Sequence, residues 1–172
     1  MIISPFSKTR REVAIRMLKL ANVKEGDILF DLGAGDGEII ITCAKHFGAT
    51  SIGIEINRDL CRRAAERVKL EGVSDRAYII NGDLFQTNLN RATVITLYLT
   101  SKANALLKEK FKRELKDNTR IVTNMFPIPG WEPYAIDMFH HGSYFHYIYL
   151  YIMGKSDVNL SEIFKRIFRK RR

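Results

Sequence analysis

The sequence has little of what would mark a membrane, disulfide-bonded or metal-binding protein. No apolar run among its 172 residues reaches the roughly 18 to 20 residues that a membrane-spanning helix needs. The two cysteines, Cys43 and Cys61, fall in separate helical patterns, so we interpret them as small buried residues and not as a disulfide or a metal pair. The four histidines have no spacing typical of a metal site. Because residues 1–5 are too few and too polar for a secretory signal, we expect a cytoplasmic protein.

The composition that remains is that of one basic domain with enough apolar residues for a core. Hydrophobic residues make up 46% of the chain, which suits a sizeable core at this length. The formal net charge is +9. Residues 159–172 hold six Lys or Arg and one acid, so this tail supplies +5 and the rest of the chain supplies +4. A basic tail favours contact with polyanions or acidic surfaces.

A glycine-rich stretch at residues 28–37, ILFDLGAGDG, organises the chain. It predicts a strand over 28–32, a tight loop and a helix over 38–47. Gly33 and Gly35 permit positive φ and let a ligand approach the backbone. The helix start adds free N–H groups and the positive end of a dipole. Asp31, at the carboxyl end of the strand, is left to meet a positive group, so a ligand with both a carboxylate and an ammonium suits the loop.

The spacing of this motif separates it from the usual dinucleotide fingerprint. That fingerprint reads G-x-G-x-x-G, whereas this chain reads D-x-G-x-G-x-G, which is one residue shorter between the last two glycines. A plain strand-to-helix turn is the alternative interpretation of any single glycine loop.

The remaining pattern alternates strands and helices and then changes. Thr9, with Glu12 three residues later, forms a capping-box pattern that predicts the start of a first helix. Short strand–helix–strand units predict right-handed crossovers and parallel pairing. The last two strands flank residues 141–143 and predict an antiparallel hairpin. Beyond the first strand and its helix, the predicted strands are 51–56, 77–80, 91–99, 119–124, 134–139 and 144–153, and the predicted helices are 58–70 and 102–115.

Two further acids follow predicted strands. Glu55 ends the second strand beside the glycine loop, where an acid in nucleotide-binding sheets accepts two ribose hydroxyls. Its alternative is a solvated acid near a helix start, since Asn57 predicts a helix cap directly after it. Asp83 is the third acid, just after the third strand.

Together these pieces resemble the class I, seven-strand, S-adenosylmethionine-dependent methyltransferases over residues 9–154. They are most similar to the archaeal protein-lysine N-methyltransferases of broad specificity and to related mitochondrial lysine methyltransferases. The resemblance implies an α/β, Rossmann-like seven-strand sheet, mostly parallel with a C-terminal antiparallel hairpin and with helices on both faces. It divides the chain into a methyltransferase domain, 1–154, and a basic C-terminal tail, 155–172. The matching segments are 16–18, 31–37, 53–57, 82–85, 94–99, 114–116, 119–122, 130–131 and 149–151.

The same resemblance implies S-adenosyl-L-methionine as the cofactor and assigns its binding residues. Glu55 would hold the ribose, Ile56 would cover the adenine face, and Asp83 would accept from the adenine amine. Thr9 matches a threonine that closes over the cofactor, although Arg10 replaces the proline that follows it in the family. The full predicted set is Thr9, Asp31, Gly33, Ala34, Gly35, Glu55, Ile56, Asp83, Leu84 and Leu97.

The acceptor side is predicted from strand ends and aromatic residues. Tyr98 is expected to face the acceptor, and Trp131 and Phe6 to wall its channel, although core packing remains an alternative for Tyr98 and loop packing for Trp131. A lysine amine, with an unperturbed pKa of about 10.4, must lose its proton before it can react. An apolar channel lowers that pKa.

One departure from the family falls at the end of the fifth strand. Where the family has Ser-His-Glu/Asp-Phe, residues 123–126 read Thr-Asn-Met-Phe, so the acid that could orient the amine is missing. With Asn124 at this point, the predicted catalytic residues are Tyr98, Asn124 and Trp131.

We therefore expect an enzyme that methylates exposed lysines of proteins and acts as a monomer. An RNA or small-molecule methyltransferase, or a catalytically weak cofactor-binding protein, remains an alternative, and the missing acid supports the last of these. Adenine-N6 methylation is disfavoured because residues 97–100, LYLT, lack the Asn/Asp-Pro-Pro-aromatic motif of those enzymes.

The tail also predicts a structure of its own. Its apolar residues recur at helical spacing and share one face, and Asn159 with Glu162 resembles a capping box. The helix is expected either to dock on the body by this face or to recruit the enzyme to an anionic membrane or nucleic acid. The apolar face consists of Leu160, Ile163, Phe164, Ile167 and Phe168.

Overall fold

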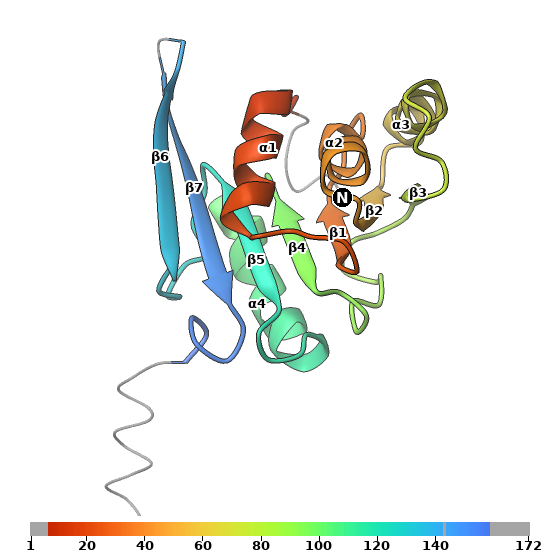
Figure 1. Ribbon diagram of the computed structural model, residues 1–172. Helices are drawn as coiled ribbons and strands as arrows, with labels where there is room; N and C mark the ends of the chain where they lie inside the picture. The colour runs from red at the N-terminus through yellow and green to blue at the C-terminus, as the bar shows by residue number, and fades with distance from the viewer. Residues whose placement is uncertain (1–6, 143, 159–172) are drawn as a thin grey trace, which may run out of the picture.

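A seven-stranded mixed sheet runs through the computed structural model, which describes residues 7–142 and 144–158 (Figure 1). The strand order is β3-β2-β1-β4-β5-β7-β6, with β1 to β5 parallel and with β7 antiparallel to both β5 and β6. The elements are α1 (Arg11–Leu20), β1 (Ile28–Leu32), α2 (Glu38–Phe47), β2 (Thr50–Glu55), α3 (Arg58–Leu70), β3 (Ala77–Asn81), β4 (Val94–Leu97), α4 (Ser101–Glu114), β5 (Arg120–Asn124), β6 (Ala135–His141) and β7 (Tyr144–Ile152). The predicted mostly parallel seven-strand sheet with a terminal hairpin is confirmed.

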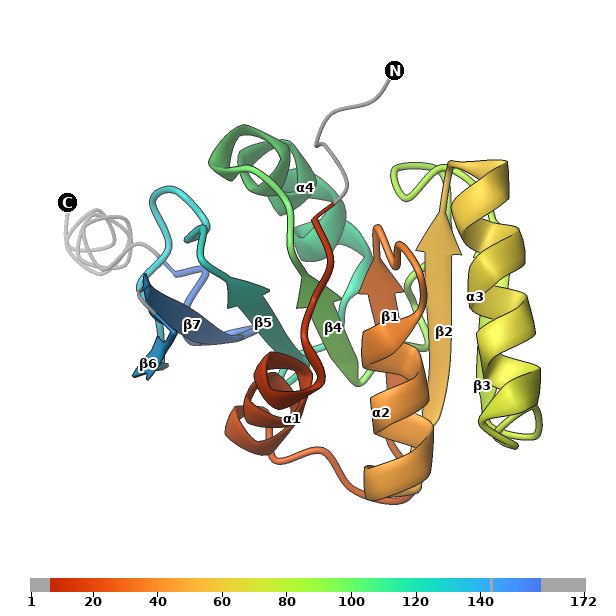
Figure 2. The same ribbon diagram turned by 90° about the horizontal axis from the view of Figure 1, so that it is seen from above.

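Helices cover both faces of this sheet, as predicted. Figure 2 shows α1, α2 and α3 on one face and α4 on the other. Alternating strand residues divide between two apolar cores because successive side chains point to opposite faces. Leu29 of β1 joins the core under α1 and α2, whereas its neighbour Phe30 joins the core under α4.

The sequence placed most elements within two residues. The helices over 38–47 and 58–70 begin and end as predicted, and Asn57 caps α3 by accepting from the N–H groups of Asp59 and Leu60. The fourth strand is shorter than predicted, because the ladder to β5 ends at the pair Leu97–Thr123 and residues 98–100 turn away.

The prediction that Thr9 caps the first helix is wrong. The cap residue is Arg10, which makes no side-chain cap hydrogen bond, and α1 begins at Arg11. The start of this helix is tied down instead by Arg11, whose Nε donates to Glu38 Oε1 over 3.0 Å.

The end of the described chain packs on the body beyond the boundary predicted at 154. Ser156 is buried, its hydroxyl accepts from the Ile152 N–H, and its carbonyl accepts from the Glu132 N–H. Phe6 and the tail from Asn159 onward lie outside the described residues. Within 7–142 and 144–158, no helix has the length and apolarity needed to cross a membrane.

Candidate cofactor and acceptor site

The glycine loop joins β1 to α2 and lies against the end of β2. Gly33 and Gly35 have φ of 85° and 56°, in the region that favours glycine. The N–H groups of Gly33 and Ala34 donate to the Ile54 carbonyl over 2.9 and 3.0 Å. On β2, a Cβ at Gly53 would stand 2.7 Å from the Ala34 Cβ, so only glycine lets the loop pack this closely.

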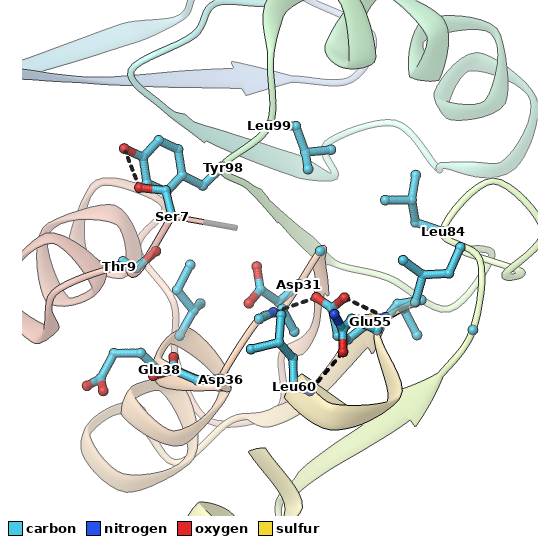
Figure 3. A pocket seen from close by; sticks show the side chains of 18 of the residues that line it. Ser7, Thr9, Asp31, Asp36, Glu38, Glu55, Leu60, Leu84, Tyr98 and Leu99 are labelled. Atoms are coloured by element: carbon cyan, nitrogen blue, oxygen red, sulfur yellow. Dashed lines mark hydrogen bonds between the residues drawn. The ribbon is translucent and has the colours of Figure 1, made fainter. Parts of the chain in front are cut away.

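Glu55 holds this loop from the end of β2. Its Oε2 accepts from the Gly35 N–H and its Oε1 accepts from the Asn57 N–H, each over 2.8 Å (Figure 3). The residue is 7% exposed. Because a carboxylate oxygen can accept more than one hydrogen bond, both oxygens remain able to bind ligand hydroxyls.

Asp31 is a buried acid one strand away. Burial raises the pKa of its carboxyl to about 7, the hydrogen bond from Thr96 opposes that rise, and the negative charge of Glu55 adds to it. Thr96 Oγ1 donates to Asp31 Oδ1 over 2.8 Å. An ammonium group placed beside Asp31 would favour its ionised form.

One cavity of about 250 Å³ connects these groups at the carboxyl ends of β1 to β4. The sequence missed Ser7, Leu60, Phe85 and Leu99, which also line the cavity. Of these, Phe85 and Leu99 lie in segments that carry the family resemblance, 82–85 and 94–99, but no role was predicted for them. Nine of the ten predicted cofactor residues line it: Thr9, Asp31, Gly33, Ala34, Gly35, Glu55, Ile56, Asp83 and Leu84.

Leu97 is the exception among the predicted cofactor residues. It is fully buried in the core beneath α4 and does not line the cavity. Neighbouring strand residues face opposite sides, so Leu97 and Tyr98 cannot both point toward the ligand.

Tyr98 takes the cavity position on the acceptor side. It is half-buried at the end of β4, and Figure 3 shows it on the opposite side of Asp31 from Glu55. The Ser7 hydroxyl donates to the Tyr98 hydroxyl over 3.4 Å, which is long for this kind of bond and leaves Tyr98 able to bind another partner.

Asn124 lies at the same edge of the sheet, at the end of β5. Leu97 of β4 pairs with Thr123 of β5, and Tyr98 and Asn124 are the residues that follow them, so they lie at equivalent positions. The side chain of Asn124 is buried, and neither amide atom has a hydrogen-bond partner within the described chain. The next residue, Met125, has a φ of 65°, so the strand ends in a strained turn. Asn124 is not among the residues that line the cavity.

Trp131 lies in the core and not in the acceptor channel. It is 6% exposed and packs between Phe111 and Tyr151, with ring centroids 6.4 and 6.3 Å away. It does not line the cavity, so the predicted channel wall is wrong for this residue and the alternative of packing holds.

An ionic network around the buried Glu38, which has no signature in the sequence, fixes the exit of the glycine loop. Glu38 accepts hydrogen bonds from Arg67 and Arg11, and Arg67 also donates to the Asp36 carbonyl over 2.9 Å. Burial pushes the pKa of Glu38 upward, but the hydrogen bonds from Arg67 and Arg11 outweigh it and hold that pKa below its ordinary value. The network joins the starts of α1 and α2 to α3.

The strand order and the cavity over the carboxyl ends of β1 to β4 define a class I methyltransferase that uses S-adenosylmethionine. Comparison with known proteins gives the family: residues 31–135 match the ANTKMT methyltransferase domain. The chain belongs to this family.

Individual relatives extend the match over most of the chain. A protein-lysine N-methyltransferase of Saccharolobus islandicus is 41% identical over 88% of this chain and 94% of its own. The adenine nucleotide translocase lysine N-methyltransferase of Mus musculus is 28% identical over 70% of this chain, which spans about half of that protein (52%).

A solved structure is also similar. The crystal structure of an RNA methyltransferase from Salinibacter ruber in complex with S-adenosyl-L-homocysteine has a TM-score of 0.81 and 35% identity, and the match covers 89% of this chain and 97% of that one.

Proposed function

We propose that the chain transfers methyl groups from S-adenosylmethionine to the ε-amino groups of lysines in proteins. The observation that carries the proposal is the position of Tyr98, which lines the cavity on the side away from Glu55 and has its hydroxyl beside that of Ser7 (Figure 3). The archaeal and mouse relatives named above are both lysine methyltransferases, which supports the same reaction.

The residues of the cavity fit the cofactor. Gly33 and Gly35 keep side chains out of the loop that a ligand approaches. Glu55 retains acceptor capacity for ribose hydroxyls. In the described part of the chain no cation pairs with Asp31, so its carboxyl suits the ammonium of the methionine part. When bound, the cofactor supplies a methyl group activated by its sulfonium.

For the acceptor amine, the chain supplies position and a poorly hydrated surrounding. Leu99 and the ring of Tyr98 line the cavity, and desolvation beside them disfavours a charged lysine and lowers its pKa. The Tyr98 hydroxyl oxygen can accept a hydrogen bond from the neutral amine and hold it in place. Since displacement at a methyl group depends on alignment, such positioning accounts for much of the rate.

We propose that Asn124, which does not line the cavity in the free chain, moves to make a second contact to the amine when the substrate binds. Its amide is buried, without a partner in the described chain, and one strand from Tyr98 at the same edge. A buried polar group without a partner costs about 1 to 3 kcal/mol, and a substrate amine that hydrogen-bonds to it would remove that cost. Asn124 thereby takes part of the role of the acid that the family carries at the position of Met125.

Methylation of RNA is the second candidate. It is favoured by the likeness to the Salinibacter RNA methyltransferase and by the net charge of +9. The absence of an Asn/Asp-Pro-Pro-aromatic motif after β4 speaks against adenine-N6 as the target.

The decisive experiment offers both substrates at once. The purified chain is incubated with methyl-labelled cofactor, a mixture of proteins and total RNA, and the label is mapped by mass spectrometry. We expect ε-methyllysine in several proteins. As a matched control, the same proteins are first acetylated with acetic anhydride, which converts their lysine amines to non-nucleophilic amides; label that persists on them, or label on RNA alone, would overturn the proposal.

The proposal also includes the assembly and surroundings of the enzyme. We propose a cytoplasmic monomer whose basic tail contacts anionic membranes or nucleic acid. Sedimentation of the full chain at two concentrations tests the first part, since a monomer keeps the same sedimentation coefficient at both.

A further inference from the structure

The terminal hairpin carries an apolar surface on the α4 side of the sheet. Cross-strand pairs Ile136–Tyr149 and Met138–Tyr147 place their side chains on one face. Ile136 and Met138 are 54% and 58% exposed. We call this surface the outer patch; it consists of Tyr134, Ile136, Met138, Phe145, Tyr147 and Tyr149.

No helix of the described chain covers the outer patch. Figure 2 shows α4 beside β4 and no described helix over β6. The opposite face of the hairpin is covered, because Arg16 of α1 pairs with Asp137 and lies 4.1 Å from the centre of the Phe139 ring. An edge strand with exposed apolar residues invites association unless another segment shields it.

The chain itself leads to this patch. After β7 it turns back toward the start of β6, where the Lys155 Nζ stands 5.2 Å from the centre of the Tyr134 ring. The Glu132 N–H donates to the Ser156 carbonyl and fixes this return. Val158, the last described residue, is 41% exposed. The tail, residues 159–172, therefore begins beside one end of the outer patch.

The length and the apolar spacing of the tail match the patch. Fourteen helical residues span about 21 Å, and the seven residues of β6 span about 23 Å. Four helical residues rise about 6 Å, close to the roughly 6.6 Å between alternate strand residues. The apolar positions Leu160, Phe164 and Phe168 can therefore meet Tyr134, Ile136 and Met138 in order.

We propose that residues 159–172 form a helix that lies along β6 with its apolar face on the outer patch. Since Asn124 pairs with Ile148, the hairpin turn extends past the end of β5 on the side where the cavity opens. A helix that starts at Val158 carries its terminal basic residues, 169–172, toward that edge. The remaining basic side chains face solvent. The proposal does not depend on which substrate is methylated.

Oxidation of Met138 by dilute peroxide, followed by peptide mass spectrometry, tests the docking. The full chain is compared with a chain that ends after Val158, in which the Met138 thioether is exposed. We expect Met138 to oxidise severalfold more slowly in the full chain. Met125, at the end of β5, serves as the internal reference and is expected to oxidise equally in both.

Single substitutions separate the apolar face from charge. Phe164→Asp and Arg169→Gln each lower the net charge by one, but only the first lies on the apolar face of the tail. We expect Phe164→Asp to raise the oxidation rate of Met138 to that of the shortened chain and Arg169→Gln to leave it low.

A crosslink gives a second measurement that does not rely on oxidation of methionine. In the double variant Ile136→Cys, Phe164→Cys, a disulfide within one chain is expected under mild oxidation. Equal oxidation of Met138 with and without the tail would overturn the proposal. Protection of Met138 that is lost on dilution would also overturn it, because the patch would then be covered by a second copy of the chain. Protection seen only with phosphatidylglycerol vesicles would overturn it as well, because the patch would then be covered by lipid.

Discussion

The half of the sheet where we propose that the cofactor binds and the half where we propose that the acceptor amine enters differ in how well their buried polar groups are paired. We call them the cofactor half and the acceptor half. Around β1 and β2, Asp31, Glu38 and Glu55 all have hydrogen-bond partners within the chain. Around β4 to β7, Thr123 and Asn124 have buried side-chain atoms without a partner among the described residues. These acids of the cofactor half are thus paired within the chain, whereas the unpaired atoms of the acceptor half are, by our proposal, paired by a bound substrate.

Both halves expose apolar side chains on an edge strand. Tyr78 and Ile80 on β3 of the cofactor half are 46% and 47% exposed, and the outer patch of the acceptor half is exposed as well. An unpaired buried amide and an uncovered strand both cost stability. In the acceptor half a substrate, or by our proposal the tail, can supply the missing contacts.

The largest expected effect lies in the cofactor half, at Glu55. Replacing it with alanine removes the acceptors of the Gly35 and Asn57 N–H groups as well as the proposed ribose contacts. We expect affinity for S-adenosylhomocysteine to fall by about 1.5 to 3 kcal/mol, or roughly 10- to 100-fold. Isothermal titration calorimetry measures this directly.

Glu55→Gln is the matched control for this change. It keeps a carbonyl oxygen as acceptor and loses only the charge and one oxygen, so it is expected to bind more tightly than Glu55→Ala. Unchanged affinity in Glu55→Ala would show that this acid is not part of the cofactor site.

The second effect is a pH dependence of cofactor affinity set by Asp31. With its pKa raised to about 7 by burial, Asp31 is neutral in the free protein at pH 6 and ionised at pH 8. An ammonium on the ligand favours the ionised form, so binding below pH 7 must release a proton. Affinity is therefore expected to fall about tenfold from pH 8 to pH 6.

Asp31→Asn isolates this group from the titration of the ligand itself. The amide cannot ionise, so the part of the pH dependence that belongs to Asp31 is expected to disappear. If the variant and the original chain show the same pH profile, Asp31 does not meet the ammonium.

The third effect concerns Asn124 in the acceptor half, where substitution is expected to affect catalysis more than stability. Asn124→Ala removes an amide that has no partner in the described chain, so we expect a change of less than about 1 kcal/mol in the free energy of unfolding. By contrast kcat/KM for a protein substrate should fall about fivefold, as expected for one lost hydrogen bond of about 1 kcal/mol. Cofactor affinity should not change.

Asn104→Ala provides a comparison, because the Nδ2 of Asn104 is paired although its Oδ1 has no partner in the described chain. Its Nδ2 donates to the Phe126 carbonyl over 2.9 Å, so alanine leaves that carbonyl unpaired. Urea unfolding is expected to show a loss of about 1 to 3 kcal/mol for Asn104→Ala. Equal losses for the two variants would mean that Asn124 is paired in solution and is not reserved for an acceptor.

The sequence predicted which residues meet at the cavity in the cofactor half, because local rules decide their positions. Asp31, the loop glycines and Glu55 follow from strand ends and from parallel pairing, which brings consecutive strand ends to one edge. The error at Leu97 has the same origin. A run of apolar residues shows that a strand is buried on both faces, but it does not show which of two neighbours faces the ligand.

The residues that sequence reasoning misplaced depend on contacts distant along the chain. Arg67 lies on a helix and reaches Glu38 across 29 positions, with no local motif to mark it. Trp131 follows two prolines in an irregular segment, where no periodicity tells a core side from a channel side. Thr9 matched a capping pattern, but α1 begins two residues later, at Arg11, whose side chain contacts Glu38.

The smallest effect on catalysis is expected from removing the tail, residues 159–172, which by our proposal packs on the acceptor half. The shortened chain should end after Val158, because Ser156 is buried and the Asp157 Oδ1 accepts from the Gly154 N–H over 2.6 Å. Every residue that lines the cavity is retained, so kcat and cofactor affinity should match those of the full chain.

Binding to anionic partners should respond differently, because the shortened chain keeps only +4 of the +9 charge. At low salt we expect weaker binding to DNA or phosphatidylglycerol vesicles, and added salt should reduce the difference between the two chains by screening. Full polyanion binding by the shortened chain would place the contact on the body and remove the tail from this role. A loss of kcat without a loss of cofactor affinity would instead show that the tail contributes to the acceptor site. The acceptor half would then depend on the tail as well as on a partner for Asn124.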